Sequence, residues 1–227
     1  MNKLFFDIET YPIYNSYKED KNLIDIWERF CDYKLDNKKE YNDELNRYDL
    51  LWDSSSSLYP SFSKILCISY ILDSDGELEG GTLCGEDEKT ILNDFNNLLL
   101  GDIDIIVGHN ILQFDIPFII RRMLVNGIKY KKMSSYLQVL GKKPWDLDFI
   151  YDLKQKLTFT SNFGSVITPS LEQACYEANI DTPKSNIING NSLVPFIKGG
   201  GDITEIYEYC QRDVYATYEL YNWLNGN

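Results

Sequence analysis

The sequence predicts an α/β fold in which helices flank a mixed five-stranded sheet, with a three-strand antiparallel meander continued by parallel strands. Two observations predict it. The first half of the chain contains three apolar strand segments, at residues 3–8, 63–72 and 76–85. In the second half, segments with helical spacing of apolar residues alternate with short apolar strands, which is typical of parallel strands joined by helices.

The early strands are separated by one long polar segment. Residues 3–8 and 63–72 are almost continuous apolar runs, and the glycine-punctuated residues 76–85 follow closely enough to pair as a meander. Residues 16–60 are polar, charged and rich in tyrosine. We interpret them as an insertion, partly helical, that ends in a flexible loop at the serine run of residues 53–57.

After residue 85, helix and strand patterns alternate. Residues 86–101 have acids in the first turn, apolar residues at helical spacing and a closing glycine, which together predict a helix. Residues 103–110 are predicted to form a buried strand, and residues 114–127 a helix that ends at Asn-Gly. Residues 145–153 are predicted to form the fifth strand, running into a helix.

The last two predicted helices cover residues 170–179 and residues 202 to about 224. Each opens with a capping-box pattern, Ser-x-x-Gln in the first and Asp-x-x-Glu in the second. The resulting order, β-β-β-α-β-α-β-α-α, is the layout of a ribonuclease H-like α/β domain. We therefore expect a single domain over residues 1–227, with the insertion at about 16–60.

Composition excludes several classes of protein. With 44% apolar and 14% aromatic residues the chain can bury a core, and it has no apolar run of about 18 residues that would span a membrane. An acid at position 7 argues against a signal peptide. Five scattered cysteines and a single histidine argue against a disulfide framework and a zinc site, and favour a reducing, cytoplasmic location.

Charge is distributed unevenly along the chain. A net charge of −13 argues against nonspecific coating of nucleic acid. Residues 116–145, however, hold seven bases and no acid. We call this stretch the basic strip. It is the footprint expected of a phosphate-binding edge, although a solvated helix and loop would show the same run. Four of its bases are proposed substrate contacts: Arg121, Arg122, Lys131 and Lys132.

Two acids end the first predicted strand. Asp7 and Glu9 are two residues apart, so they point to the same side of the strand. Carboxylates held close together repel each other, and burial makes each ionised form costlier. Either the strand surfaces at this point and both acids are solvated, or a cation sits between them.

Two later patterns also place acids at defined positions. Asp115 follows the predicted strand 103–110 in V-G-H-N-I-L-Q-F-D and stands at the start of a helix, where an N-cap aspartate is common. Tyr209 and Asp213 are four residues apart on the last helix, hence on one face. That face borders an apolar one, although an ordinary surface pair would have the same spacing.

In this order, the stretches FDIET, VGHNILQFDIPFI and YCQRDV resemble the motifs of the DEDD (DnaQ-like) superfamily of 3′→5′ exonucleases, in the branch with tyrosine in the last motif (DEDDy). The chain is most similar to the proofreading exonuclease domain of family-B DNA polymerases, in free-standing form. The stretches SKILCIS, YDLK, SLEQA and TPK also look familial, whereas the insertion is not accounted for. SLYPS at 57–61 resembles a polymerase motif. It lacks that motif's aspartate, because Ser54 stands there, and we expect no polymerase activity.

The resemblance implies roles for particular residues. The implied catalytic set is Asp7, Glu9, Asp115, Tyr209 and Asp213. Its four acids would bind two divalent cations, Mg²⁺ or Mn²⁺, and its tyrosine would orient the attacking water. The histidine branch would place a histidine at about position 208, which is glutamate here, and His109 is assigned no catalytic role.

Further residues match positions that touch nucleotides in the family. Thr10, Asn110 and Phe114 would contact the terminal nucleotides, and Lys184, in T-P-K, would reach the scissile phosphate. Other roles stay open for three of them. Phe114 would also fit a core, Thr10 would also fit a backbone hydrogen bond, and Lys184 would also fit a solvated loop.

The chemistry independently fits a nuclease. Phosphodiester cleavage needs an activated water and cover for developing negative charge, which two divalent ions supply, and Mg²⁺ and Mn²⁺ prefer oxygen ligands. We therefore expect a metal-dependent 3′→5′ exonuclease acting on single-stranded or frayed DNA ends.

Two alternatives remain. The same acids would serve an exoribonuclease, since contacts to the 2′-OH cannot be read from the sequence. From another class, the chain would be a catalytically idle nucleic-acid-binding or interaction module, against which the intact set of acids argues. The net charge implies weak DNA affinity, which a replication or repair protein docked on the insertion would offset.

Overall fold

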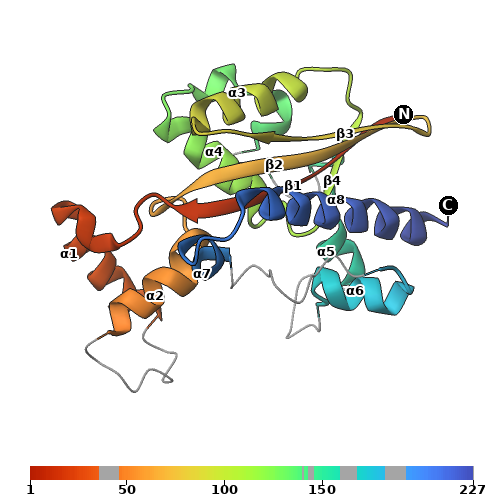
Figure 1. Cartoon of the computed structure of the whole chain (residues 1–227). Helices are drawn as coiled ribbons and strands as arrows, with labels where there is room; N and C mark the ends of the chain where they lie inside the picture. The colour runs from red at the N-terminus through yellow and green to blue at the C-terminus, as the bar shows by residue number, and fades with distance from the viewer. Residues whose placement is uncertain (36–45, 140, 143–145, 159–167, 182–192, 227) are drawn as a thin grey trace.

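A computed structural model describes residues 1–35, 46–139, 141–142, 146–158, 168–181 and 193–226. Five strands form one mixed sheet in the order β3-β2-β1-β4-β5 (Figure 1). The strands are β1 (Asn2–Pro12), β2 (Ser63–Ser74), β3 (Glu77–Cys84), β4 (Ile105–Gly108) and β5 (Ile150–Asp152). The first three pair antiparallel, and β1 with β4 and β4 with β5 pair parallel, which confirms the predicted sheet.

The central strand β1 is longer than the predicted 3–8, and its length shapes the site. It pairs with β2 from Asn2 to Pro12, but with β4 only from Lys3 to Phe5. The second half of β1 therefore has no strand on its β4 side. Between Glu9 and Thr10 the β1–β2 register shifts, and such irregularities increase the local twist of a strand.

Helices cover both faces of the sheet. On one face lie α3 (Glu88–Leu98) and α4 (Asp115–Val125), followed by the short 3-10 turns η4 (Tyr130–Lys132) and η5 (Ser135–Leu137). On the other lie α5 (Leu153–Leu157), α6 (Leu171–Ala178) and the long α8 (Ile203–Asn225) (Figure 1). Each predicted helix of the second half is present, which confirms the predicted element order.

Alternation along β1 divides its side chains between the two layers. Leu4, Phe6 and Ile8 belong to the core shared with α3 and α4, whereas Phe5 belongs to the core shared with α8. Asp7 and Glu9 have the parity of Phe5, so they face the α8 side. This alternation brings the acids of the first strand to the last helix of the chain.

The insertion folds around its own aromatic cluster. It contains η1 (Tyr17–Glu19), α1 (Lys21–Phe30), the π-helical turn η2 (Cys31–Leu35), α2 (Arg47–Ser55) and the 3-10 turn η3 (Ser56–Leu58). The Trp27 ring lies 5.0 Å from that of Trp52 and 4.9 Å from that of Phe62, between ring centroids. The cluster gives the insertion a small hydrophobic core beside the main one.

The prediction that the insertion ends in a flexible serine-rich loop is wrong. Residues 53–57 are helical, forming the end of α2 and most of η3, and Ser56 and Ser57 are buried. The Ser56 hydroxyl donates to the carbonyl of Trp52 at 2.5 Å, one turn earlier. Packing of Leu51 and Trp52 in the aromatic cluster therefore outweighs the weak helix propensity of the serines.

Two details at the C-terminal end also differ from the sequence prediction. A short helix, α7 (Leu193–Lys198), was not predicted. The Asp202 carboxylate caps α8 by accepting from the Thr204 amide, a simple N-cap, whereas α6 carries the full predicted capping box. None of the helices in the described ranges is long and apolar enough to cross a membrane.

Candidate active site

Three of the predicted acids come together at the junction of β1 and α8. Asp7, Glu9 and Asp213 each offer a carboxylate oxygen, and these oxygens all lie within 4.8 Å of one another. β1 supplies two of them because residues two apart share a face, and α8 packs against that face with Val214 in its core. A set of three hard oxygen ligands at this spacing fits Mg²⁺ or Mn²⁺.

Asp115 is the fourth acid of the group. It is the first residue of α4, is 2% exposed, and lies near the backbone amides of Ile8 and of its own residue. It lines a hollow of about 340 Å³ together with Asp7, Glu9 and Asp213. The structure thus brings all four predicted metal-binding acids to one hollow, from three elements of the fold.

Burial and mutual repulsion act on Asp7, Glu9 and Asp115. Burial raises the pKa of Asp7 and of Glu9 well above the usual range, and Asp115 and Asp213 raise both further. Burial is also the main cause that raises the pKa of Asp115 to about 7. A divalent cation would offset this repulsion and hold the acids ionised at neutral pH.

Tyr209 lies one turn before Asp213 on α8 and is 5% exposed. Burial and then the charges of Asp213, Glu9 and Asp7 raise the pKa of its phenol far above the ordinary value, as does its hydrogen bond with Asp213. The phenol therefore stays protonated at neutral pH and can donate a hydrogen bond. The raised pKa favours a hydrogen-bond donor over a phenolate base at this position.

Asp152 supports one wall of the hollow. Its buried carboxylate accepts hydrogen bonds from the backbone amides of Asn110, Leu112 and Lys154, each at 3.0 Å. Asn110 adopts a left-handed backbone conformation, with φ of 70°. The hydrogen bonds to Asp152 stabilise this turn between β4 and α4. They thereby help to fix the position of Asp115, the first residue of α4.

Three predicted substrate contacts, Thr10, Asn110 and Phe114, line the hollow. The Thr10 hydroxyl is buried and donates to the backbone carbonyl of Ser57 at 2.7 Å, which is the alternative role weighed for it. The buried side-chain oxygen of Asn110 has no hydrogen-bond partner among the described residues, so it is an acceptor available to a ligand in the hollow. Phe114 is partly buried, and its ring lies 5.5 Å from that of Phe118.

The basic strip is not a single binding surface. Arg122 is buried, and its guanidinium forms a two-point hydrogen-bonded pair with Glu88, at 2.8 and 2.6 Å. This contradicts its predicted contact with substrate, because the charge is already neutralised inside the protein. Arg121, Lys131 and Lys132 are exposed but are not among the described residues that line the hollow. Lys184 lies outside the described residues.

Sequence reasoning missed several residues of the hollow. Lys154, which follows the fifth strand in Y-D-L-K, lines it, as do Ser57 and Leu58 of the insertion and Leu193 of α7. The Y-D-L-K stretch looks familial in the sequence, but only the fold shows that its lysine lines the same hollow as the acids. Ser57 and Leu58 belong to the SLYPS stretch, whose resemblance to a polymerase motif gave no hint of this position.

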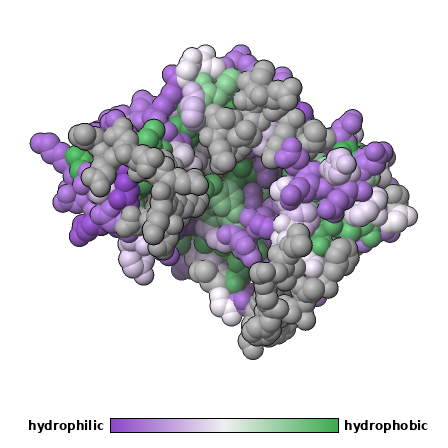
Figure 2. Space-filling view, turned by 90° about the horizontal axis from the view of Figure 1, so that it is seen from below, coloured by the Kyte–Doolittle hydropathy of each residue, from purple (hydrophilic) through white to green (hydrophobic). Residues whose placement is uncertain are grey.

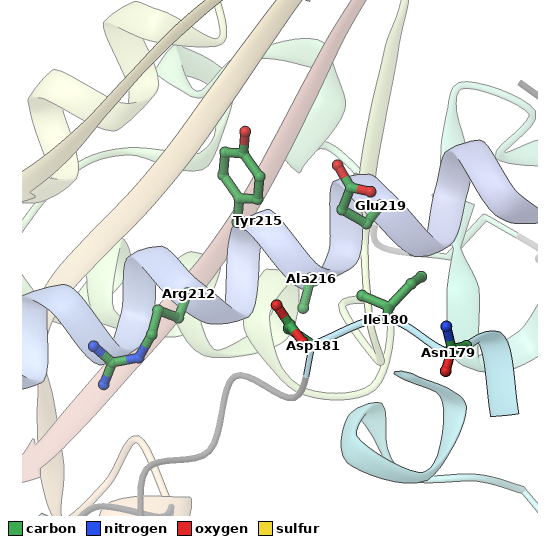
Figure 3. Close-up of a pocket in the computed structure, with 7 residues that line it drawn as sticks. All are labelled: Asn179, Ile180, Asp181, Arg212, Tyr215, Ala216 and Glu219. Atoms are coloured by element: carbon green, nitrogen blue, oxygen red, sulfur yellow. The ribbon is translucent and has the colours of Figure 1, made fainter. Parts of the chain in front are cut away.

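The face of the molecule seen from below is hollowed (Figure 2). It has a central recess with hydrophobic residues at its base and hydrophilic residues along its right-hand side (Figure 2). A second hollow, of about 460 Å³, lies between α8 and the segment after α6 (Figure 3). The Tyr215 and Glu219 side chains point away from that segment, and none of the predicted catalytic residues lines this hollow.

This arrangement agrees with the family to which the sequence is matched. A family model described as "Predicted 3'-5' exonuclease related to the exonuclease domain of PolB" matches residues 55–225, and the chain belongs to this family. The matched range includes Asp115, Tyr209 and Asp213 but begins after Asp7 and Glu9. The position of those two acids in the site therefore comes from the structure.

The fold also resembles that of a solved polymerase. The family B DNA polymerase from the hyperthermophilic archaeon Pyrobaculum calidifontis matches with a TM-score of 0.59 and 18% sequence identity. The match covers 99% of this chain and 24% of the polymerase chain, so this chain spans about a quarter of its length. At this identity the likeness establishes the ribonuclease H-like fold. No curated protein matches the chain.

Proposed function

We propose that this protein is a metal-dependent 3′→5′ exonuclease that removes nucleotides from single-stranded or frayed DNA 3′ ends. The observation that supports it best is the convergence of four acids, the buried Asp115 and the partly buried Asp7, Glu9 and Asp213, on one hollow. Buried like charges are unfavourable without a cation, so the group is best explained as a metal site.

The residues present fit two divalent cations held by Asp7, Glu9, Asp115 and Asp213. When bound, two Mg²⁺ or Mn²⁺ ions would activate the attacking water and stabilise the charge that develops on the phosphate. The protonated Tyr209 would donate a hydrogen bond that orients this water. Lys154 is the described lysine best placed to contact a backbone phosphate, and Asn110 and Phe114 would hold the terminal nucleotide.

DNA is favoured over RNA because the family is described as related to the exonuclease domain of PolB, and the similar fold is that of a DNA polymerase. We propose that the exonuclease domain spans residues 1–227, with a replication or repair protein as its partner. The intact acid group argues against a catalytically idle binding module.

The test is digestion of matched 3′- and 5′-labelled DNA and RNA oligonucleotides with Mg²⁺, Mn²⁺ or EDTA. The proposal expects a metal-dependent ladder that starts at the 3′ end of DNA, and no ladder with Asp7→Asn. A ladder on RNA alone would favour the exoribonuclease. No cleavage with any metal, with binding retained, would leave the binding module.

A further inference from the structure

One turn of the insertion lies at the active-site hollow. Ser57 and Leu58, the last residues of η3, line the hollow with the four acids and Phe114. In the sequence this stretch resembles a polymerase motif but lacks that motif's aspartate. Its position gives the insertion a part in the site itself, in addition to any part in docking.

Hydrogen bonds fix the backbone on both sides of Leu58. The Ser57 carbonyl accepts from the hydroxyls of Thr10 at 2.7 Å and Ser63 at 3.2 Å, and the Tyr59 carbonyl accepts from the Ser63 hydroxyl at 2.7 Å. Thr10, Ser57 and Ser63 are all buried. The backbone around Leu58 is therefore tied to Thr10, which follows Glu9 in β1, and to Ser63, the first residue of β2.

The aromatic cluster and α7 support the same turn from behind. The Tyr59 ring lies 4.6 Å from that of Phe30, and Phe62 packs on Trp27. On α7, Lys198 binds the Asp53 carboxylate of α2 and the Asn15 carbonyl, each at 2.5 Å. These contacts make the turn a fixed wall of the hollow.

The Leu58 side chain is 50% exposed although the turn that carries it is anchored on both sides. It belongs to none of the hydrophobic clusters among the described residues, so its isobutyl group has no fold-stabilising contact of that kind. An apolar side chain held rigidly at the edge of a polar hollow is suited to contact the apolar face of a nucleobase.

We propose that Leu58 is a substrate-positioning residue, which packs against the 3′-terminal nucleobase opposite Phe114. This inference rests on the proposed function and adds a role for the insertion. Contact with the face of a base is available to all four bases, so Leu58 would position the terminal nucleotide with little sequence preference.

The test compares Leu58→Ala with Leu50→Ala on two DNA substrates, one with a normal 3′-terminal nucleotide and one with an abasic 3′-terminal residue. Leu50 is a matched control, because it is a 46% exposed leucine of α2 in the same insertion and does not line the hollow. On the normal substrate we expect Leu58→Ala to raise KM about tenfold with kcat within about twofold. On the abasic substrate Leu58→Ala should equal wild type, because the contact is already absent.

The outcomes separate this inference from the proposed function. If wild type releases no nucleotides, the proposed function fails. If wild type is active and the KM of Leu58→Ala equals that of Leu50→Ala, or rises equally on both substrates, the proposed role of Leu58 is contradicted and the proposed function is not. Leu58→Met, which keeps an apolar side chain of similar volume, should retain the wild-type KM. A tenfold rise in KM in Leu58→Met would also contradict the inference.

Discussion

At the scale of single residues, the pair that opens the chain shows how a local pattern is completed by distant parts of the fold. Asp7 and Glu9 share a side because β1 is a strand, but their surroundings come from α4 and α8, more than 100 residues later. Asp213 lies within 4.8 Å of both, and burial raises the pKa of each. Such a group is unfavourable alone and favourable around a cation.

Tyr209 is predicted to act through its hydroxyl. Tyr209→Phe keeps the ring packed in its buried site and removes only the hydrogen-bond donor, so we expect kcat to fall about ten- to hundredfold with KM nearly unchanged. Initial rates on a single-stranded DNA substrate would measure both. Because the phenol pKa is raised, the rate of wild type should show no step from tyrosine ionisation below pH 9. An unchanged kcat in Tyr209→Phe would contradict this role.

Asp115 should make the metal-free protein less stable as pH rises. Burial raises its folded-state pKa to about 7, above the unfolded value, so the stability it contributes is present below about pH 4 and is lost as pH rises to 7. Relative to Asp115→Asn, wild type should lose about 2 kcal/mol of unfolding free energy between pH 5.5 and 7.5 in EDTA.

Urea unfolding at three pH values would measure this loss. Comparison with Asp115→Asn is needed because other groups also make stability depend on pH. Burial lowers the pKa of His109, so its contribution to stability increases as pH rises, and this contribution cancels when the two proteins are compared. Added Mn²⁺ should reduce the loss at pH 7.5, since the cation stabilises the ionised form. Parallel pH profiles for the two proteins would be inconsistent with a buried acid at this position.

At the scale of elements, the pairing of α3 with α4 explains why part of the basic strip does not face a ligand. The Glu88 carboxylate accepts from Arg122, from the Ile65 amide at 2.8 Å and from the Asn126 side chain at 2.8 Å. It therefore joins α3, β2 and α4 at one buried point. A sequence pattern cannot distinguish this arginine from its neighbour Arg121, because the partner acid lies 34 positions away.

The two neighbouring arginines should respond differently to the same substitution. Arg122→Met leaves Glu88 buried without its cation, so we expect a loss of about 3 kcal/mol in unfolding free energy and a KM within about twofold of wild type. Arg121→Met, at an exposed position, should change stability by less than about 0.5 kcal/mol. Denaturant unfolding and initial rates would measure these effects. A rise in KM with no loss of stability in Arg122→Met would restore its role in substrate binding.

Element prediction failed where tertiary packing overrides composition. The serines of residues 53–57 have the composition of a loop, but the aromatic cluster holds them in helical turns. The short helix α7 has too few residues to show a helical period. In contrast, the strands β2 and β3 and the helices α3, α4 and α8 carry enough periodic apolar residues to be predicted directly.

At the scale of the whole molecule, the order of the motifs along the chain predicts more than any motif alone. The D-x-E, N-x-x-x-F-D and Y-x-x-x-D patterns are each common, yet the fold brings their acids to one hollow. Lys154, Ser57 and Leu58 were not predicted because the motifs that contain them give no sign that these residues lie beside the acids. They reach the hollow because the fold brings η3 and α5 to the acids of β1, α4 and α8.

Anomalous diffraction from crystals grown with Mn²⁺ at pH 7.5 would show directly whether the four acids form a metal centre. We expect manganese density at the carboxylates of Asp7, Glu9 and Asp213, with a second ion near Asp115, and loss of this density in Asp213→Asn. Well-ordered carboxylates in this hollow with no manganese at saturating concentration would contradict the assignment of this site as a metal centre.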